Sequence, residues 1–177
     1  NNFTSRKQSA LFSSYYSTQS IDYKSLKIDL KKTAFEIHNQ FRAFNFREYQ
    51  MPFFENWSIC KTKILNQKST EKSGKILYEN EEKFLISSID YNIELIKDYY
   101  PLFWESSIRN NTQGLLKSLK YIQDIEMRNK EGWNALILAC YNGSFEASKI
   151  LLENGANSST QNHKGTSALM YALDYYS

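Results

Sequence analysis

Apolar residues between Leu30 and Phe44 recur in steps of three and four, the spacing of one face of an α-helix. The stripe that they form consists of Leu30, Ala34, Ile37, Phe41 and Phe44. Asp29 or Thr33 can cap this helix, and Thr33 with Glu36 makes the T-x-x-E pattern of a capping box. The sequence therefore predicts an amphipathic helix that ends near residue 44.

After Pro52 the helical spacing gives way to short runs that alternate or are apolar throughout. The run "WSICKTKIL" alternates, and an acidic turn at residues 80–82 separates two shorter runs. Runs of this length between turn residues indicate strands. We predict a small antiparallel sheet after the helix, with strands at 57–65, 74–79 and 83–89 and a fourth candidate at 92–100.

A shift of 33 residues relates two segments of the C-terminal part: "GWNALILACYNG" begins at Gly132 and "GTSALMYALDYY" at Gly165. The segment between them, "SFEASKILLENGANSS", ends its apolar run with Gly155 and Ala156. This pattern resembles the ankyrin repeat, in which small alanines let paired helices approach and glycines take positive φ values after helices. The positions that match in this register are Ala135 with Ala168, Leu136 with Leu169, and Ala139 with Ala172.

Departures from the ankyrin pattern lead to further expectations. Its T-P-L-H element reads "NALI" at 134–137 and "SALM" at 167–170, so we expect weaker hydrogen bonding where these helices start. Residues 99–131 look like a degenerate capping repeat that packs on the next unit through Leu116, Leu119 and Ile122. A single repeat cannot bury its own face, so the stop at Ser177 predicts a truncated last repeat with further repeats missing.

These patterns predict an α+β chain of two units. Residues 1–98 hold a linker, one helix and the antiparallel strands, and residues 99–177 hold α-helical ankyrin repeats. The net charge of +3, from 22 basic and 19 acidic residues, is too small for the dense basic stripe that binds nucleic acid.

The cysteines and the hydropathy pattern indicate the compartment. Cys60 and Cys140 fit no metal or redox spacing, which is typical of free thiols in a reducing, intracellular setting. No apolar stretch approaches the roughly 18 residues of a membrane span, and no secretory signal opens the chain. We expect a soluble cytoplasmic protein with no nucleic-acid or membrane partner.

Four elements of the first unit resemble the segment that follows the catalytic domain of sugar N-formyltransferases. They are the "SSYYS" stretch at 13–17, the "ID" before the helix, the "RAF" at the helix end and the "FREYQMP" turn at 46–52. Some members of that family also carry C-terminal ankyrin repeats, and this chain has both parts in that order. The resemblance covers about residues 5–97 and 99–177.

The resemblance implies a function for the whole protein. Such enzymes transfer a formyl group from N10-formyltetrahydrofolate to the amine of a dTDP-linked amino-dideoxyhexose. They supply surface polysaccharides such as the O-antigen of lipopolysaccharide, and they generally form homodimers. The resemblance leaves open which sugar and nucleotide are used.

The same resemblance places the catalytic residues and the folate pocket in a Rossmann-like domain of about 180 residues that precedes the matched segment. The chain begins with Asn1 rather than methionine, and we expect it to be a fragment without its catalytic domain. His38 and His163 have no partner acid at a motif spacing, so no catalytic residue is predicted in this chain.

The stretch "FRAFNFREYQ" supplies the first group of candidate contacts. Aromatic faces stack on a base, and an arginine can hold a diphosphate in two-pronged geometry. We predict that this turn contacts the nucleotide sugar or a second subunit, although Phe41 and Phe44 can equally be core residues. The candidates are Arg42, Phe44, Phe46, Arg47, Tyr49 and Gln50. A serine and tyrosine cluster at residues 13–16 can donate hydrogen bonds to the sugar or form a linker.

Trp133 and Tyr141 are candidates on the ankyrin surface. Trp133 follows the repeat glycine, where ankyrin proteins contact their partners. We expect either a binding surface for a protein or second nucleotide ligand, or packing of Trp133 on the loop of the neighbouring repeat.

Two other functions remain open. A free-standing ankyrin interaction module with an unrelated aromatic-rich cap would have a start codon close upstream and no affinity for nucleotide sugars. A relative of the methionyl-tRNA formyltransferases would need basic linkers for tRNA, which the net charge of +3 does not favour, and ankyrin repeats are not expected there.

Overall fold

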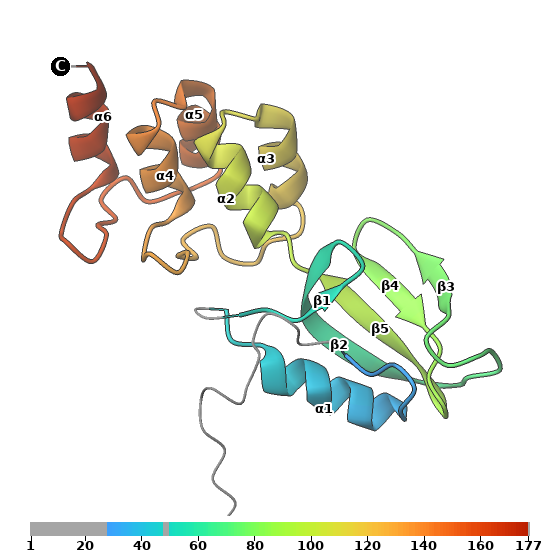
Figure 1. Cartoon of the computed structure of the whole chain (residues 1–177). Helices are drawn as coiled ribbons and strands as arrows, with labels where there is room; N and C mark the ends of the chain where they lie inside the picture. Colours follow the sequence, from blue (N-terminus) through green and yellow to red (C-terminus); the bar gives the residue numbers. More distant parts are fainter. Residues whose placement is uncertain (1–27, 48–49, 177) are drawn as a thin grey trace, which may run out of the picture.

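A computed structural model describes residues 28–47 and 50–176 of the chain, and its first unit is one helix packed on a curled antiparallel sheet (Figure 1). The sheet order is β1-β2-β5-β4-β3, with every neighbouring pair antiparallel. The elements are α1 (Ala34–Phe44), β1 (Phe53–Phe54), β2 (Trp57–Lys68), β3 (Ile76–Glu79), β4 (Lys83–Ile86) and β5 (Tyr91–Lys97). The α+β prediction is confirmed for this unit.

Helix α1 begins where the capping box predicted. The Thr33 hydroxyl accepts from the Glu36 backbone N–H at 3.3 Å, and the Glu36 carboxylate accepts from the Thr33 N–H at 3.0 Å. Asp29 lies outside the helix, where it accepts from the Lys31 N–H. Of the predicted stripe, Ala34, Ile37 and Phe41 are buried, Phe44 is half-buried, and Leu30 packs on the core just ahead of the helix.

The sheet unit has a core of its own between α1 and the strands. Paired residues of β4 and β5 lie side by side in it, Phe84 opposite Leu95 and Ile86 opposite Ile93. The remaining buried apolar members are Ala34, Ile37, Phe41, Phe54 and Ile59. The four predicted strands are present, but β4 and β5 end three residues earlier than their predicted segments. The short strand β1 was not predicted.

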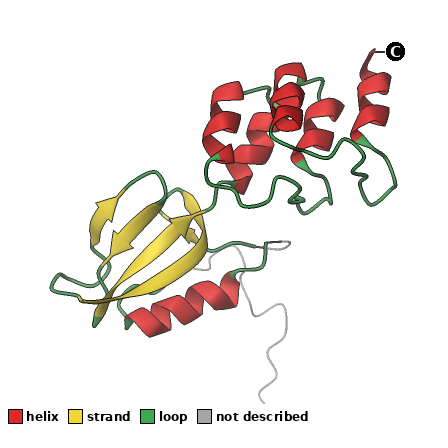
Figure 2. Ribbon diagram, turned by 180° about the vertical axis from the view of Figure 1, so that it is seen from behind, coloured by secondary structure: helices red, strands yellow, loops and turns green. Residues whose placement is uncertain are grey.

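The second unit is all helical and stacks in two layers, with α2, α4 and α6 in one and α3 and α5 in the other (Figure 2). Its helices are α2 (Tyr100–Ile108), α3 (Thr112–Leu119), α4 (Ala135–Tyr141), α5 (Phe145–Glu153) and α6 (Ala168–Tyr176). Leu119 and Ile122 pack on the core as expected, but Leu116 is 49% exposed and Leu115 is fully buried in its place. The prediction for Leu116 was wrong because residues one apart on a helix point in directions about 100° apart.

The expected weakness at the start of α4 was also wrong. Asn134 has no exposed surface, and its side-chain oxygen accepts from the Ile137 N–H at 2.9 Å. Its amide nitrogen donates to the Glu126 carboxylate at 2.8 Å. At the equivalent position of α6 the Ser167 hydroxyl lies 3.4 Å from the Met170 N–H. Asparagine thus replaces the threonine of the ankyrin pattern as an N-cap.

The substitution Asn134→Ala is expected to lower the free energy of unfolding by about 1–3 kcal/mol, because it removes a helix cap and leaves buried polar groups without partners. Ser167→Ala, at the matching position of the next repeat, should cost less than about 1 kcal/mol because its hydrogen bond is long. Urea unfolding of both variants measures the difference. Equal losses would contradict the assignment of Asn134 as the stronger cap.

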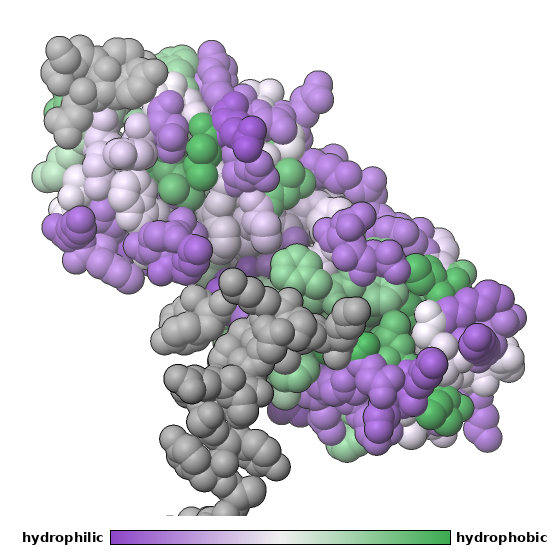
Figure 3. Space-filling model, viewed as in Figure 1, coloured by the Kyte–Doolittle hydropathy of each residue, from purple (hydrophilic) through white to green (hydrophobic). Residues whose placement is uncertain are grey.

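None of the described helices is both long enough and apolar enough to cross a lipid bilayer. On the face shown in Figure 3, apolar side chains gather over the strands, whereas the loops of the ankyrin unit are mostly polar. Ile76 of β3 is 38% exposed and Tyr78 is 53% exposed. The sheet unit therefore keeps part of its apolar surface in contact with solvent.

Candidate functional site

Two backbone hydrogen bonds join Phe46 and Gln50 in the predicted turn after α1. The Phe46 N–H donates to the Gln50 carbonyl at 3.0 Å, and the Gln50 N–H donates to the Phe46 carbonyl at 2.7 Å. The Asn45 side chain donates to the Cys60 carbonyl at 2.9 Å and so fixes the loop to β2. The Asn45 bond holds the end of α1 against the sheet.

Arg47 points from this loop toward the start of the ankyrin unit. Its Nη1 and Nη2 atoms donate to the Asp98 carboxylate at 2.7 and 3.2 Å. Its guanidinium carbon lies 4.5 Å from the centroid of the Tyr100 ring. The two-pronged geometry predicted for a diphosphate is therefore directed at a carboxylate of the chain itself.

The other candidates of the turn are spread over different surfaces. Arg42 is exposed on α1, Phe44 is half-buried, and Phe46 is 57% exposed. Gln50 is half-buried, and its Oε1 atom has no hydrogen-bond partner among the described residues. Tyr49 and the cluster at residues 13–16 lie outside the residues that the structure describes.

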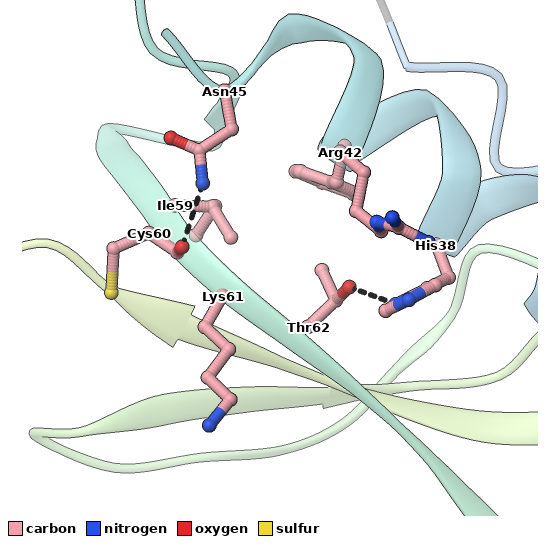
Figure 4. Close-up of a pocket in the computed structure, with 8 residues that line it drawn as sticks. His38, Arg42, Asn45, Ile59, Cys60, Lys61 and Thr62 are labelled. Atoms are coloured by element: carbon pink, nitrogen blue, oxygen red, sulfur yellow. Dashed lines mark hydrogen bonds between the residues drawn. The ribbon is translucent and has the colours of Figure 1, made fainter. Parts of the chain in front are cut away.

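A pocket of about 280 Å³ lies between α1 and β2 (Figure 4). His38 and Arg42 line it from the helix, and Lys61 and Thr62 line it from the strand. His38 Nδ1 and Thr62 Oγ1 share a hydrogen bond of 2.6 Å. Arg47 does not line this pocket, so the structure separates Arg42 of α1 from Arg47 of the turn.

Burial lowers the pKa of His38 below the ordinary value of 6.5, and the charge of Arg42 lowers it further. The unfolded chain therefore binds a proton at His38 at a higher pH than the folded chain does. The contribution of His38 to stability should therefore be complete well above pH 6.5 and should be lost as the pH falls below that value.

Replacing His38 with glutamine is expected to flatten this pH dependence, because the titrating group is then absent. His163→Gln provides the matched control, since His163 is exposed. Urea midpoints measured between pH 7.5 and 5.5 test the expectation. It fails if wild type and His38→Gln lose the same stability over that range.

Sequence reasoning missed a groove between the two units. The groove has a volume of about 460 Å³, and Arg47 lies beside Asp98 and Tyr100 in its wall. Arg47 also lines an adjoining cavity of about 730 Å³ that includes Asp124 and His163 of the ankyrin loops. The charged and aromatic run "KDYY" at the end of β5 was the available signal.

The aromatic candidates of the ankyrin unit are in contact with one another. The rings of Trp133 and Tyr141 meet edge to face at 5.1 Å between centroids, and Trp133 stacks on Tyr171 at 5.1 Å. Tyr141 is 54% exposed, whereas Trp133 is half-buried. Tyr171 was not predicted as part of this cluster. The 33-residue register aligns it with Leu138, which is buried in the preceding repeat. Trp133 therefore packs on the next repeat and also borders an exposed ring.

The described residues offer little for metal or thiol chemistry. No three histidine, cysteine or acidic side chains among residues 28–47 and 50–176 converge on a metal position. Burial, with the Asp98 charge second, raises the pKa of Cys60 to about 11. Burial also raises the pKa of Cys140. Both thiols are free and stay protonated at neutral pH.

Two family profiles match the chain, one over each unit. Residues 20–97 match "Formyl transferase, C-terminal domain", and residues 103–177 match "Ankyrin repeats (3 copies)". The comparison with curated proteins gave no match. The second unit is thus an ankyrin-repeat unit, as the 33-residue register indicated.

Two solved structures are similar to part of the chain. WlaRD, a sugar 3N-formyl transferase in the presence of dTDP and 5-N-formyl-THF, is 42% identical over 52% of this chain, with a TM-score of 0.44. An N-formyltransferase from Helicobacter canadensis, in complex with folinic acid and dTDP-3-aminofucose, is 45% identical over 52% of this chain, with a TM-score of 0.41. The chain covers 32% and 33% of the length of those proteins.

Proposed function

We propose, from the union of a formyl transferase C-terminal domain and ankyrin repeats in one chain, that this is the accessory C-terminal region of a sugar N-formyltransferase. The whole protein would transfer the formyl group of N10-formyltetrahydrofolate to the amine of a dTDP-linked amino-dideoxyhexose. The observation that carries the proposal is the family match over residues 20–97, directly followed by the repeats.

The proposal assigns no bond-breaking step to this chain. Folate binding and catalysis belong to the upstream domain that the resemblance implies, and the residues described here supply contacts. dTDP is the nucleotide that the resemblance implies, and the WlaRD structure is also one in the presence of dTDP. Surface polysaccharide synthesis in the cytoplasm belongs to the same proposal, and the two free thiols agree with a reducing compartment.

The turn at residues 45–50 is proposed to border the nucleotide-sugar pocket or a subunit contact. The Phe46 ring is exposed, and the Phe46 backbone is hydrogen-bonded to that of Gln50 in both directions, which limits the entropy lost when the ring stacks on a ligand. The other candidates are Arg42, Phe44, Arg47, Tyr49 and Gln50. A homodimer through the partly exposed strands is a further part of the proposal.

The assay for the proposed function uses the full-length protein with its native reading frame upstream of Asn1. Formylation should require both N10-formyltetrahydrofolate and a dTDP-linked amino sugar. UDP-linked sugars and tRNA serve as alternative substrates in parallel reactions. A start codon or further repeats directly upstream, or tight and salt-sensitive tRNA binding, would overturn the proposal.

The aromatic surface of Trp133 and Tyr141 is proposed to bind a partner or a second nucleotide ligand. Both rings belong to the same repeat, and Tyr141 is 54% exposed although it contacts Trp133 and Tyr171. Stacking of a base on an aromatic side chain contributes about 1–3 kcal/mol. The surface therefore has the chemistry for a thymine base.

Trp133→Ala is expected to weaken dTDP binding to the chain by about 1–3 kcal/mol because it removes one ring of the aromatic surface and the ring that supports Tyr141. Titration calorimetry of the 177-residue chain measures this loss. Tyr141→Ala provides a variant with less effect on folding, and Leu169→Ala changes an exposed residue outside the cluster as a control. Unchanged affinity and thermal stability in Trp133→Ala would exclude the aromatic surface as a site.

The second candidate function is a non-enzymatic ankyrin-repeat module for protein interaction. The match of residues 103–177 to ankyrin repeats favours it independently of the first unit. It predicts a partner protein on the aromatic surface and no formylation by the full-length protein. The assay with full-length protein separates the two functions.

A further inference from the structure

The two units meet through residues 98–100, which are all buried. Asp98 is 3% exposed, Tyr99 is 2% exposed and Tyr100 is 7% exposed. A flexible connection between independent domains would instead be exposed and make few contacts across the boundary. The burial of this junction indicates that the sheet unit and the ankyrin unit do not move freely.

Asp98 makes contacts on both sides of the junction. Its carboxylate accepts both guanidinium N–H bonds of Arg47, which belongs to the turn after α1. Its Oδ1 atom also accepts from the backbone N–H of Tyr100, at the start of α2, at 3.2 Å. One buried carboxylate therefore orients the turn of the sheet unit and the first helix of the ankyrin unit.

Tyr100 extends this connection into the ankyrin loops. Its ring lies under the Arg47 guanidinium. Its hydroxyl donates to the Asp124 carbonyl at 3.1 Å and accepts from the Asp124 N–H at 3.0 Å. Contacts thus run without a break from Arg47 to the loop between α3 and α4.

Tyr99 joins the units on the other side of the junction. Its ring lies between Trp57 of β2, at 5.0 Å, and Tyr121, two residues after α3, at 4.4 Å. Its hydroxyl donates to the Glu81 carbonyl at 2.6 Å. The Glu81 carboxylate forms an ion pair with Lys117 of α3. Both sides of the boundary are therefore tied by side chains from each unit.

We propose that residues 98–100 form an interdomain lock that joins the two units into one cooperative body, with Asp98 as the residue that positions Arg47. The physical reason is that neither unit can unfold alone without losing the contacts that Tyr99 and Tyr100 make across the boundary. The Tyr99 ring would leave its place between Trp57 and Tyr121, and the Tyr100 ring would leave the Arg47 guanidinium. The ankyrin unit is then a fixed extension of the sheet unit rather than a tethered module.

The lock also affects Arg47 in the turn at 45–50, and this effect rests on the proposed function. If Arg47 borders the nucleotide-sugar pocket, the lock fixes its guanidinium in one orientation, and a ligand on the ankyrin loops is energetically linked to that pocket through the same contacts. The lock itself does not depend on this consequence, because it follows from contacts within the chain.

Hydrogen exchange of the whole 177-residue chain tests the lock without any substrate. Leu151→Ala opens the ankyrin core, where Leu151 is fully buried. If the units form one body, protection should fall at least about tenfold in the distant amides of β5 as well as in α4. Leu152→Ala changes the 47% exposed neighbour and should leave both elements unchanged.

The same comparison in an Asp98→Asn background shows whether the lock carries the effect. In that background Leu151→Ala should lower protection in α4 but no longer in β5. If Asp98→Asn fails to fold, Tyr100→Phe serves instead, because it removes only the hydroxyl that binds Asp124. In that background Leu151→Ala should lower the protection of β5 by less than it does in the wild type. The proposal is wrong if β5 keeps its protection in Leu151→Ala, or if the loss in β5 persists in the lock variants.

The exchange result and the formylation assay are independent. If Leu151→Ala lowers protection in β5 only when the lock is intact, and the full-length protein does not formylate sugars, the lock is supported and the proposed function is rejected. A protein that formylates sugars but whose units exchange independently would support the proposed function and reject the lock.

Discussion

Replacement of Phe103 by alanine is expected to lower the free energy of unfolding by about 3–5 kcal/mol, the range for removing a fully buried phenylalanine. Phe103 has no exposed surface and lies in the centre of α2, where its ring meets Tyr100 edge to face at 6.3 Å between centroids. The substitution leaves a cavity between α2 and the helices packed on it, and the rigid core can close only part of it.

Phe145→Ala is the matched control, because Phe145 belongs to the same unit but is 62% exposed. Its loss should stay within about 0.5 kcal/mol. Urea unfolding followed by circular dichroism compares the two variants. A cost for Phe103→Ala below about 1 kcal/mol would show that α2 does not belong to the cooperative core of the repeats.

The second large effect is expected at Gly132, which has a φ of +80° and is buried. A Cβ atom there would lie 2.4 Å from the His163 ring. Gly132→Ala therefore costs the strain of a left-handed residue, about 1–2 kcal/mol, and a smaller amount for moving the exposed His163 ring aside, for a total of about 2–3 kcal/mol. Thermal and urea unfolding measure this loss.

Gly165 separates the backbone strain from the cost of moving His163. It has the same repeat position as Gly132 and a φ of +77°. A Cβ atom there would have no neighbouring atom closer than 3.9 Å. Gly165→Ala should cost only the backbone strain, about 1–2 kcal/mol. Adding His163→Ala to Gly132→Ala should recover the difference. Equal costs at both glycines would show that His163 moves aside without loss.

This contact joins consecutive ankyrin loops and bears on the proposed binding surface. Gly132 immediately precedes Trp133, and the Asn129 side chain accepts from the Trp133 N–H at 3.0 Å. A shift of the backbone at Gly132 would therefore also move the Trp133 side chain. A loss of dTDP affinity in Gly132→Ala but not in Gly165→Ala would therefore agree with a site at Trp133.

The turn "FRAFNFREYQ" shows how far residue chemistry alone could reach. Its arginines and aromatic rings predicted a two-pronged contact with a diphosphate and stacking on a base, whereas Arg47 makes a two-pronged contact with a carboxylate of the chain and lies over a tyrosine ring. The partner, however, is Asp98 with Tyr100, which lie about fifty residues later in the chain. Which anion an arginine holds depends on what the fold brings within about 4 Å, and local sequence does not contain that information.

The sequence by itself determined the elements whose signals are local. Helical spacing with a T-x-x-E cap placed α1, short runs between turns placed the main strands, and a 33-residue register with recurring alanines and glycines identified the repeats. Each of these follows from contacts between residues near one another in the chain or one repeat apart.

Tertiary structure decided the contacts between distant segments. It buried Leu115 rather than Leu116, completed the aromatic cluster with Tyr171, and enclosed Asp98 between the two units. Burial and ion pairing depend on which surfaces meet, and those surfaces come from parts of the chain that are far apart in sequence. The pairing of the sheet unit with the ankyrin unit is therefore visible only in the folded chain.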